Sequence, residues 1–185
     1  AEILKHSLIL KNDFFGWLDK HSHQILINKN SKILQQAIIK SCKIKTYFIN
    51  KDIYEKNIRM ILNFGHTFAH AIELQNNYSK KINHGEAVIM GMMMATKLSC
   101  LKNICNKKTL LQLKSVYRLN NLQYDIKKFF KKNEHSKIIK HMVNDKKNND
   151  DRINLILLKK VGQTTLPNSY KITKQELKDI FNKII

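Results

Sequence analysis

Three histidines lie in a stretch whose spacing could bring their imidazole rings together. His66 and His70 are four positions apart in a run that reads as helical. Residues at i and i+4 lie on one face of a helix, one turn apart. His84 follows after a short polar connection and begins a second apolar run. Two helices joined by a loop would then aim three imidazoles at one cavity, as a metal site or a proton-transfer site requires.

The spacing alone leaves a structural role open as well. A pair of histidines on one helical face can equally be a surface pair or a pair satisfied within the core. The familiar zinc-protease pattern, in which glutamate follows the first histidine, is absent because Thr67 follows His66. The histidine pair therefore needs support from the residues around it.

A polar stripe runs along the segment that carries the histidine pair. Arg59, Asn63, His66 and His70 are spaced by four, three and four positions in a helix expected over residues 58–74. Such a stripe would be costly to bury without partners, so it is expected to line a wet, charged site. Gly65 interrupts the helix at a cost of about 1 kcal/mol relative to alanine. That cost predicts a close approach of a ligand or of another helix.

The remaining elements expected from the pattern are mostly helices. Thr173 and Glu176 form a capping box for the last of them, and Ser31 is a candidate cap for the second. The methionine-rich helix is expected to form part of the core. Helices are expected over residues 1–20 with a break near 12–13, 31–48, 85–102, 107–118, 125–131, 134–143 and 173–185.

A small β-hairpin completes the expected fold. Its strands are residues 153–158 and 161–165, joined across Lys159 and Lys160. No internal repeat or coiled-coil heptad is evident. The pattern thus predicts a mainly α-helical domain with a small β-hairpin.

The composition is strongly basic, with 34 Lys and Arg against 14 Asp and Glu and a formal charge of +20. A nucleic-acid or anion partner is one interpretation. The other interpretation is a genome rich in A and T, whose codons favour Lys, Asn and Ile. This second interpretation is favoured because all three residues are abundant and the basic residues are spread along the chain. A basic nucleic-acid-binding module stays a distant alternative.

The remaining composition favours a cytoplasmic protein without a membrane partner. The three cysteines show no Cys-x-x-Cys spacing and fit reduced thiols. The longest apolar run, residues 87–95, is too short to span a bilayer. No signal peptide is visible.

The order of the motifs resembles the C-terminal half of the 3-dehydroquinate synthases. Residues 63–73, Asn-Phe-Gly-His-Thr-Phe-Ala-His-Ala-Ile-Glu, are followed by His-Gly-Glu-Ala-Val at 84–88. The opening residues 1–6 are similar to that family's Ala-Glu-aliphatic-aliphatic-Lys segment. The chain starts inside this motif without an initiator Met, so we expect a fragment that lacks an N-terminal NAD-binding domain. Residues 1–185 would then be a single helical, metal- and substrate-binding domain of the dehydroquinate synthase-like and iron-type alcohol dehydrogenase-like superfamily.

The resemblance implies a role for nine residues. Three would bind the metal, Zn²⁺ or Co²⁺: Glu2, His66 and His84. The other six would contact the substrate or move protons: His70, Lys5, Lys45, Arg59, Asn63 and Lys146.

Several details of these implied roles can be stated in advance. His70 is expected to relay a proton or to contact phosphate. The cations expected to neutralise the substrate carboxylate and phosphate are Lys5, Lys45, Arg59 and Lys146. The choice of Lys146 over Lys147 is not fixed by the sequence. Asp52 and Glu55 match acidic positions of the family, whereas Tyr54 stands where an arginine is expected.

The activity implied is conversion of 3-deoxy-D-arabino-heptulosonate 7-phosphate to 3-dehydroquinate and phosphate in the shikimate pathway. Its implied course is transient oxidation by NAD, phosphate elimination, reduction and intramolecular aldol closure. The implied partner is this small phosphorylated sugar acid, and the full-length enzyme is expected to be a homodimer. A related sugar-phosphate cyclase and a metal-dependent polyol dehydrogenase are the alternatives.

Overall fold

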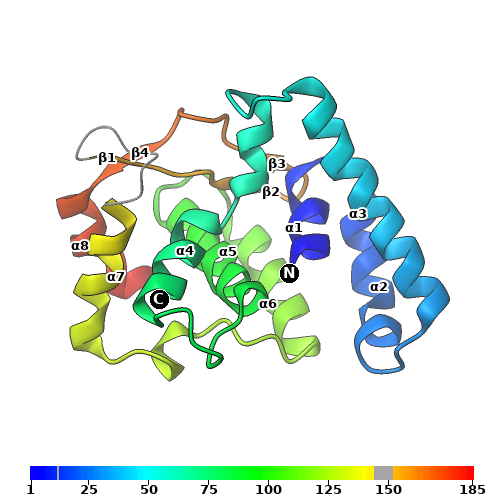
Figure 1. The fold of residues 1–185 in the computed structure, drawn as a ribbon, viewed down its shortest axis with the longest axis horizontal. Helices are drawn as coiled ribbons and strands as arrows, with labels where there is room; N and C mark the ends of the chain where they lie inside the picture. The colour runs from blue at the N-terminus through cyan, green and yellow to red at the C-terminus, as the bar shows by residue number, and fades with distance from the viewer. Residues whose placement is uncertain (12, 144–151) are drawn as a thin grey trace.

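Helix α5 (His84–Leu101) lies at the centre of the molecule and organises the other helices around it (Figure 1). Nearly all of its residues from Ala87 to Ser99 are buried, as expected of a helix that is apolar on every side. Its methionines at 90 and 92–94 are almost fully buried, which confirms their predicted place in the core. Helix α5 packs against α4, α6, α8 and α1.

The computed structural model describes residues 1–11, 13–143 and 152–185. Helices α1, α2 and α3 pack together on one side of the α4–α5 pair, and α7 and α8 lie on the other (Figure 1). The helices are α1 (Glu2–Ile9), α2 (Phe14–Leu26), α3 (Ser31–Lys51), η1 (Ile58–Asn63), α4 (His66–Gln75), α5, α6 (Lys107–Leu119), η2 (Ile126–Lys128), η3 (Lys132–Glu134), α7 (His135–Val143) and α8 (Lys174–Ile184). The prediction of a mainly helical fold is confirmed.

Two expected helices are shorter than predicted. The segment 58–74 is not one continuous helix, because Gly65 has a φ of +81° and separates the 3₁₀ helix η1 from α4. Glycine adopts this left-handed conformation without the steric cost of a Cβ atom. The segment 125–131 contains only the single turn η2. The break predicted near residues 12–13 is confirmed, since α1 ends at Ile9 and α2 begins at Phe14.

The strands form two short antiparallel pairs and differ from the single predicted hairpin. Strand β1 (Arg152–Asn154) pairs with β4 (Lys171–Thr173), with Ile153 opposite Ile172. Strand β2 (Leu158–Lys160) pairs with β3 (Gln163–Thr164). The predicted turn at Lys159–Lys160 is wrong because Gly162, with a φ of +83°, makes the turn instead.

Side-chain caps fix where three helices begin. Asn30, and not the predicted Ser31, caps α3 by accepting the Ile33 N–H. Asn83 and Glu86 form a reciprocal capping box at the start of α5. Thr173 caps α8 by accepting the Glu176 N–H, which is the Thr173 half of the predicted capping box.

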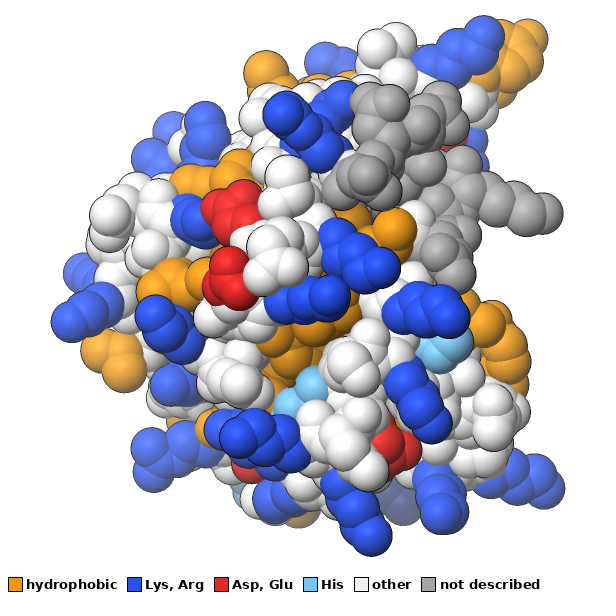
Figure 2. Space-filling model, turned by 90° about the vertical axis from the view of Figure 1, so that its left-hand side faces the viewer, with side chains coloured by type: hydrophobic (Ala, Val, Ile, Leu, Met, Phe, Trp, Pro, Cys, Tyr) orange, Lys and Arg blue, Asp and Glu red, His pale blue; other side chains and the backbone are white. Residues whose placement is uncertain are grey.

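On one face of the molecule, basic side chains are not gathered in one stripe (Figure 2). Figure 2 shows this on the face that carries α7 and α8, where Lys and Arg side chains are scattered with few acidic ones among them. Within the described residues, no helix is long and apolar enough to cross a membrane.

Replacing Lys97 with methionine is expected to stabilise the protein by about 1 kcal/mol at pH 7. Burial on α5, followed by repulsion from Lys114, lowers the pKa of Lys97 to about 8. A lysine whose pKa falls on folding opposes folding wherever it is charged, so stability should rise as pH increases from about 8 to 10.5. Solvent screening of the partly exposed amine reduces the gain well below the full shift. Urea unfolding at pH 7 and pH 10 measures this effect, and Lys108→Met, at an exposed position, is the control. Equal stability of wild type and Lys97→Met at pH 7 would contradict the prediction.

Candidate metal centre

Three helices begin at the same place, and each begins with a potential metal ligand. Glu2, His66 and His84 are the first residues of α1, α4 and α5. Their ligand atoms all lie within 4.8 Å of one another. Helix N-termini carry partial positive charge, so this junction favours carboxylate and other anions. The structure thus brings together the three residues that the family resemblance assigned to a metal site.

The distances fit a small metal ion. Glu2 Oε1 lies 3.7 Å from His66 Nε2, and the rings of His66 and His84 are 5.5 Å apart. Two atoms bound tetrahedrally to one zinc ion are separated by roughly 3–4 Å. Glu2 and His84 are about half exposed at their side chains, so one side of the cluster is open to solvent.

Each histidine of the cluster already has a partner on its other ring nitrogen. His84 Nδ1 lies 3.0 Å from Glu73 Oε1, and His66 Nδ1 lies 3.3 Å from the carbonyl oxygen of Phe64. Donation from Nδ1–H leaves Nε2 unprotonated and able to bind a metal. The donor set, one carboxylate and two imidazoles, is that of a catalytic zinc site with room for another ligand. The residues therefore fit the metal that the sequence predicted.

Lys5 is the buried cation of the site. Its side chain is only 3% exposed and its Nζ donates a 2.8 Å hydrogen bond to Glu2 Oε2. Burial lowers the pKa of Lys5, while Glu2 opposes that shift and Lys45 adds to it. Burial raises the pKa of Glu2, but the opposing effects, led by the hydrogen bond and charge of Lys5, hold this pKa below its usual value. Glu2 is thus an ionised carboxylate with one oxygen toward Lys5 and the other toward His66.

His66 is neutral near pH 7. Burial, followed by the charge of Lys5, lowers the pKa of His66 to about 4. A neutral imidazole is the form that binds a metal. His6 Nε2 lies 3.9 Å from Glu2 Oε2. Burial, followed by the charge of Lys5, lowers the pKa of His6 to about 4 as well. Its Nδ1 is 2.7 Å from Ser41 Oγ on α3, which ties α1 to α3.

The other predicted substrate residues lie beside this cluster or form a second group. The rings of His70 and His66 meet edge to face, 5.6 Å apart. Lys45 lies on the exposed face of α3, close enough for its charge to lower the pKa of Lys5. Lys146 lies outside the described residues.

Arg59 and Asn63 meet at Glu55. Asn63 Nδ2 donates to Glu55 Oε1 at 2.9 Å, and Arg59 Nε lies 3.8 Å from Glu55 Oε2. Both residues belong to η1, so the predicted stripe is divided between two helices. Asp52 organises the loop before η1 by accepting the backbone N–H groups of residues 56, 57 and 59.

Sequence reasoning gave no role to Glu73, the partner of His84. A signal was present, because Glu73 lies three residues after His70 and so shares its helical face. The family resemblance marks Glu55 only as a matching acidic position. Its contact with Asn63 depends on the loop bending back over η1, which a helical spacing does not reveal.

Two glycines allow α4 and α5 to approach closely enough to form the site. A Cβ atom on Gly91 of α5 would lie 2.1 Å from the carbonyl oxygen of Gly65. A Cβ atom on Gly65 would in turn lie 2.8 Å from the Met92 nitrogen. Gly65 directly precedes His66, so this crossing sets the position of His66 relative to α5. The predicted close approach at Gly65 is confirmed.

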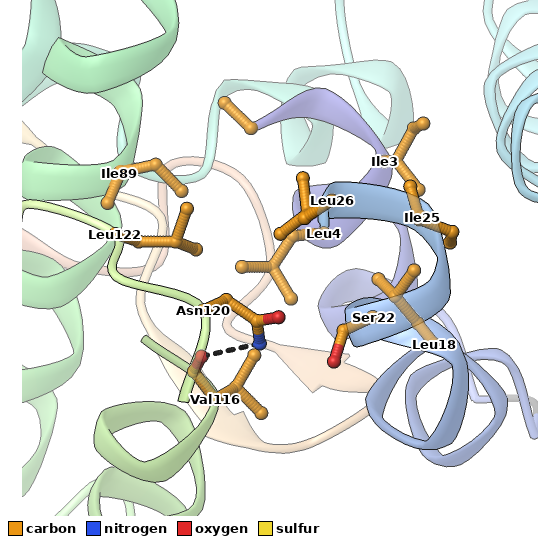
Figure 3. Close-up of a pocket in the computed structure, with 11 residues that line it drawn as sticks. Ile3, Leu4, Leu18, Ser22, Ile25, Leu26, Ile89, Val116, Asn120 and Leu122 are labelled. Atoms are coloured by element: carbon orange, nitrogen blue, oxygen red, sulfur yellow. Dashed lines mark hydrogen bonds between the residues drawn. The ribbon is translucent and has the colours of Figure 1, made fainter. Parts of the chain in front are cut away.

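A separate, apolar pocket lies between α1–α2 and the α5–α6 region (Figure 3). Leu4, Leu26, Ile89 and Leu122 point into it. Asn120 is its main polar side chain, and it donates to the Val116 carbonyl at 2.8 Å. The side chains that line the pocket are uncharged, so it does not suit the phosphorylated ligand that the family resemblance implies.

The fold and cluster together define a mainly helical domain with a His, His and carboxylate donor set, of the kind that catalytic metal sites use, where three helices begin. Residues 1–148 match the family model described as 3-dehydroquinate synthase C-terminal. The chain belongs to this 3-dehydroquinate synthase C-terminal family.

Relatives named 3-dehydroquinate synthase are similar over most of the chain. The protein of Pelagibacter ubique is 48% identical over 162 residues, which are 88% of this chain and 44% of that protein. The protein of Dictyoglomus thermophilum is 35% identical over 184 residues, or 100% and 48% of the two chains. The chain therefore spans about half the length of these curated relatives.

Solved structures of sugar-phosphate cyclases share the fold. A 2-deoxy-scyllo-inosose synthase, complexed with carbaglucose-6-phosphate, NAD⁺ and Co²⁺, matches with a TM-score of 0.79 and 27% identity over 97% of this chain and 49% of its own. The 2-epi-5-epi-valiolone synthase of Streptomyces hygroscopicus, with NAD⁺ and Zn²⁺ bound, has a TM-score of 0.80 over 99% and 49% of the two chains. At 18% identity, this second likeness shows the fold alone.

Proposed function

We propose that this chain is the metal- and substrate-binding half of a 3-dehydroquinate synthase, which converts 3-deoxy-D-arabino-heptulosonate 7-phosphate to 3-dehydroquinate and phosphate. The observation that carries the proposal is the cluster of Glu2, His66 and His84, with the buried cation Lys5 bonded to its carboxylate. The family membership supports the choice of reaction. A homodimeric state and a cytoplasmic location are proposed from the family resemblance alone.

The three clustered residues would hold Zn²⁺ or Co²⁺. When bound, such an ion supplies Lewis acidity that lowers the pKa of a substrate hydroxyl. NAD would be held mainly by protein outside this chain and would supply a reversible hydride acceptor, so the net redox change is zero.

The chain's own residues would bind the two anionic groups of the substrate and move protons. Lys5 and Lys45 provide positive charge on one side of the cluster, and Arg59 provides a planar guanidinium on η1 suited to a carboxylate or phosphate. Asn63, held by Glu55, would offer an oriented amide. His70 would relay a proton, and its ring contact with His66 outside the donor set supports this role. Lys146 is proposed as a further phosphate contact.

A substrate comparison tests this function. The full-length protein that carries this chain, supplied with Zn²⁺ and NAD, should release phosphate from 3-deoxy-D-arabino-heptulosonate 7-phosphate and form dehydroquinate in equal amount. Glucose 6-phosphate, which lacks the carboxylate, serves as the contrasting substrate. Turnover of glucose 6-phosphate but not of the heptulosonate would reject the proposal in favour of a sugar-phosphate cyclase of the kind found among the structural neighbours.

Replacing Glu73 with glutamine is expected to weaken metal binding by about 10–100-fold. Glutamine keeps the shape of the side chain but removes the charge that faces His84 Nδ1, and outer partners of this kind typically contribute that much affinity. Competition for Zn²⁺ with a chelating dye measures the change without reference to turnover. Glu86→Gln is the matched control, because Glu86 caps the same helix but does not belong to the cluster. Equal affinity of Glu73→Gln and wild type would contradict the prediction.

A further inference from the structure

Two cysteine thiols face each other at the end of α5 that is opposite to the metal centre. Cys100 lies in the last turn of α5, and Cys105 lies in the short connection between α5 and α6. Their sulfur atoms are 2.8 Å apart. A disulfide bond is about 2.05 Å long, so a shift of less than 1 Å would bring the sulfur atoms to bonding distance. Neither the metal centre nor the proposed reaction uses these thiols.

The backbone of the intervening turn holds the two thiols in this position. Ile104 N–H donates to the Ser99 carbonyl at 2.8 Å, and Asn103 N–H donates to the Cys100 carbonyl at 3.1 Å. Asn103 adopts a φ of +57°, which reverses the chain tightly. On the far side, Asn106 caps α6 by accepting the Thr109 N–H at 2.9 Å. The pair is therefore fixed between two helix ends and does not depend on a chance encounter of mobile side chains.

The exposure of the two thiols differs in a way that suits stepwise oxidation. Cys105 is buried, with its thiol directed at the Thr96 carbonyl 3.8 Å away. Cys100 is partly exposed, so a small oxidant in solvent reaches it first. Cys42 on α3 is exposed and belongs to a different part of the fold.

We propose that Cys100 and Cys105 are a modification site that closes to an intramolecular disulfide under a peroxide oxidant. The Cys100 thiolate attacks a peroxide oxygen, and the O–O bond breaks. This gives a sulfenic acid at Cys100 and a hydroxide ion, which takes up a proton and leaves as water. The Cys105 sulfur then attacks the Cys100 sulfur, and the departing hydroxide leaves as a second water. Two thiols and one hydrogen peroxide thus yield one disulfide and two waters, with two electrons passing from sulfur to peroxide.

The rate of this reaction should depend steeply on pH. Burial, followed by the hydrogen bond with Cys105, raises the pKa of Cys100 to about 12, and the charge of Lys114 on α6 offsets only part of this shift. The thiolate is the reacting form. Oxidation is therefore expected to be slow at pH 7 and to accelerate about tenfold for each pH unit up to pH 9.

Tryptic mapping of the full-length protein tests the proposal directly. Lys97, Lys102 and Lys107 are cleavage points that place the two cysteines in separate peptides, residues 98–102 and 103–107. After treatment with hydrogen peroxide and blocking of free thiols, we expect these two peptides to appear as one disulfide-linked species that reductant separates. The link should persist in Cys42→Ser and disappear in Cys100→Ser.

The wild-type protein alone can overturn the proposal. Recovery of both peptides with blocked free thiols, or with sulfinic acid at Cys100, would do so. A disulfide from either peptide to Cys42 would do so as well, since it would show that Cys100 and Cys105 do not preferentially bond to each other. Metal content should be the same before and after oxidation, because the pair lies at the opposite end of α5 from His84.

Discussion

Replacing His66 with alanine is expected to remove the metal from the protein and to lower turnover by about 1,000-fold or more. His66 is the more enclosed of the two histidines in the donor set and faces both Glu2, at 3.7 Å, and His84. Its loss leaves one carboxylate and one imidazole, which are too few to hold a catalytic ion. Lewis-acid stabilisation worth several kcal/mol would then be lost from the transition state, and each 1.36 kcal/mol is a factor of ten in rate.

Metal content and turnover should be measured together on the full-length protein. His23→Ala is the matched control because His23 is exposed on α2, away from the donor set. His70→Ala separates the two proposed histidine roles: it should lower turnover while the metal stays bound. Retention of one metal ion per chain in His66→Ala would show that the ligands lie elsewhere.

Local spacing was sufficient to predict the part of the site built within one helix. His66 and His70 share a face because they are four residues apart in α4, and their rings are in contact. The prediction of one continuous helix over residues 58–74 is wrong at Gly65, where a residue in the left-handed conformation ends one helix before the next begins. Glycine can continue a helix at modest cost or break it at none, and the packing of α5 against this position decides between the two.

The rest of the site depends on contacts between segments far apart in the sequence. Glu2 reaches His66 only because α1 and α4 begin beside the same end of α5. No periodicity within α1 encodes this placement, and for Glu2 it was the family motif, not the pattern, that indicated a ligand. The contact of Glu55 with Asn63 and the turn at Gly162 likewise depend on loop conformations, which the hydrophobic pattern does not specify.

Replacing Gly91 with alanine is expected to lower the free energy of unfolding by about 2–3 kcal/mol. Alanine is the better helix former by about 1 kcal/mol, so propensity alone predicts stabilisation. The added Cβ atom, however, would lie 2.1 Å from the Gly65 carbonyl oxygen and 3.1 Å from the Ala69 nitrogen. Both are backbone atoms, one in α4 and one in the residue directly before it, so no side chain can turn away and the two helices must separate. Overpacking of this kind typically costs about 1–3 kcal/mol, and more where the backbone must move.

Gly16→Ala provides the opposite expectation within the same chain. Gly16 is exposed on α2 and has no atom within 4 Å of the position of an added Cβ. That variant should be stabilised by about 0.5–1 kcal/mol. Urea unfolding of both variants measures the difference, and a Gly91→Ala protein as stable as Gly16→Ala would show that α4 and α5 do not cross as described. Because α4 begins with His66 and α5 with His84, the folded fraction of Gly91→Ala should also bind Zn²⁺ less tightly than wild type, which links the packing of these two helices to the geometry of the metal centre.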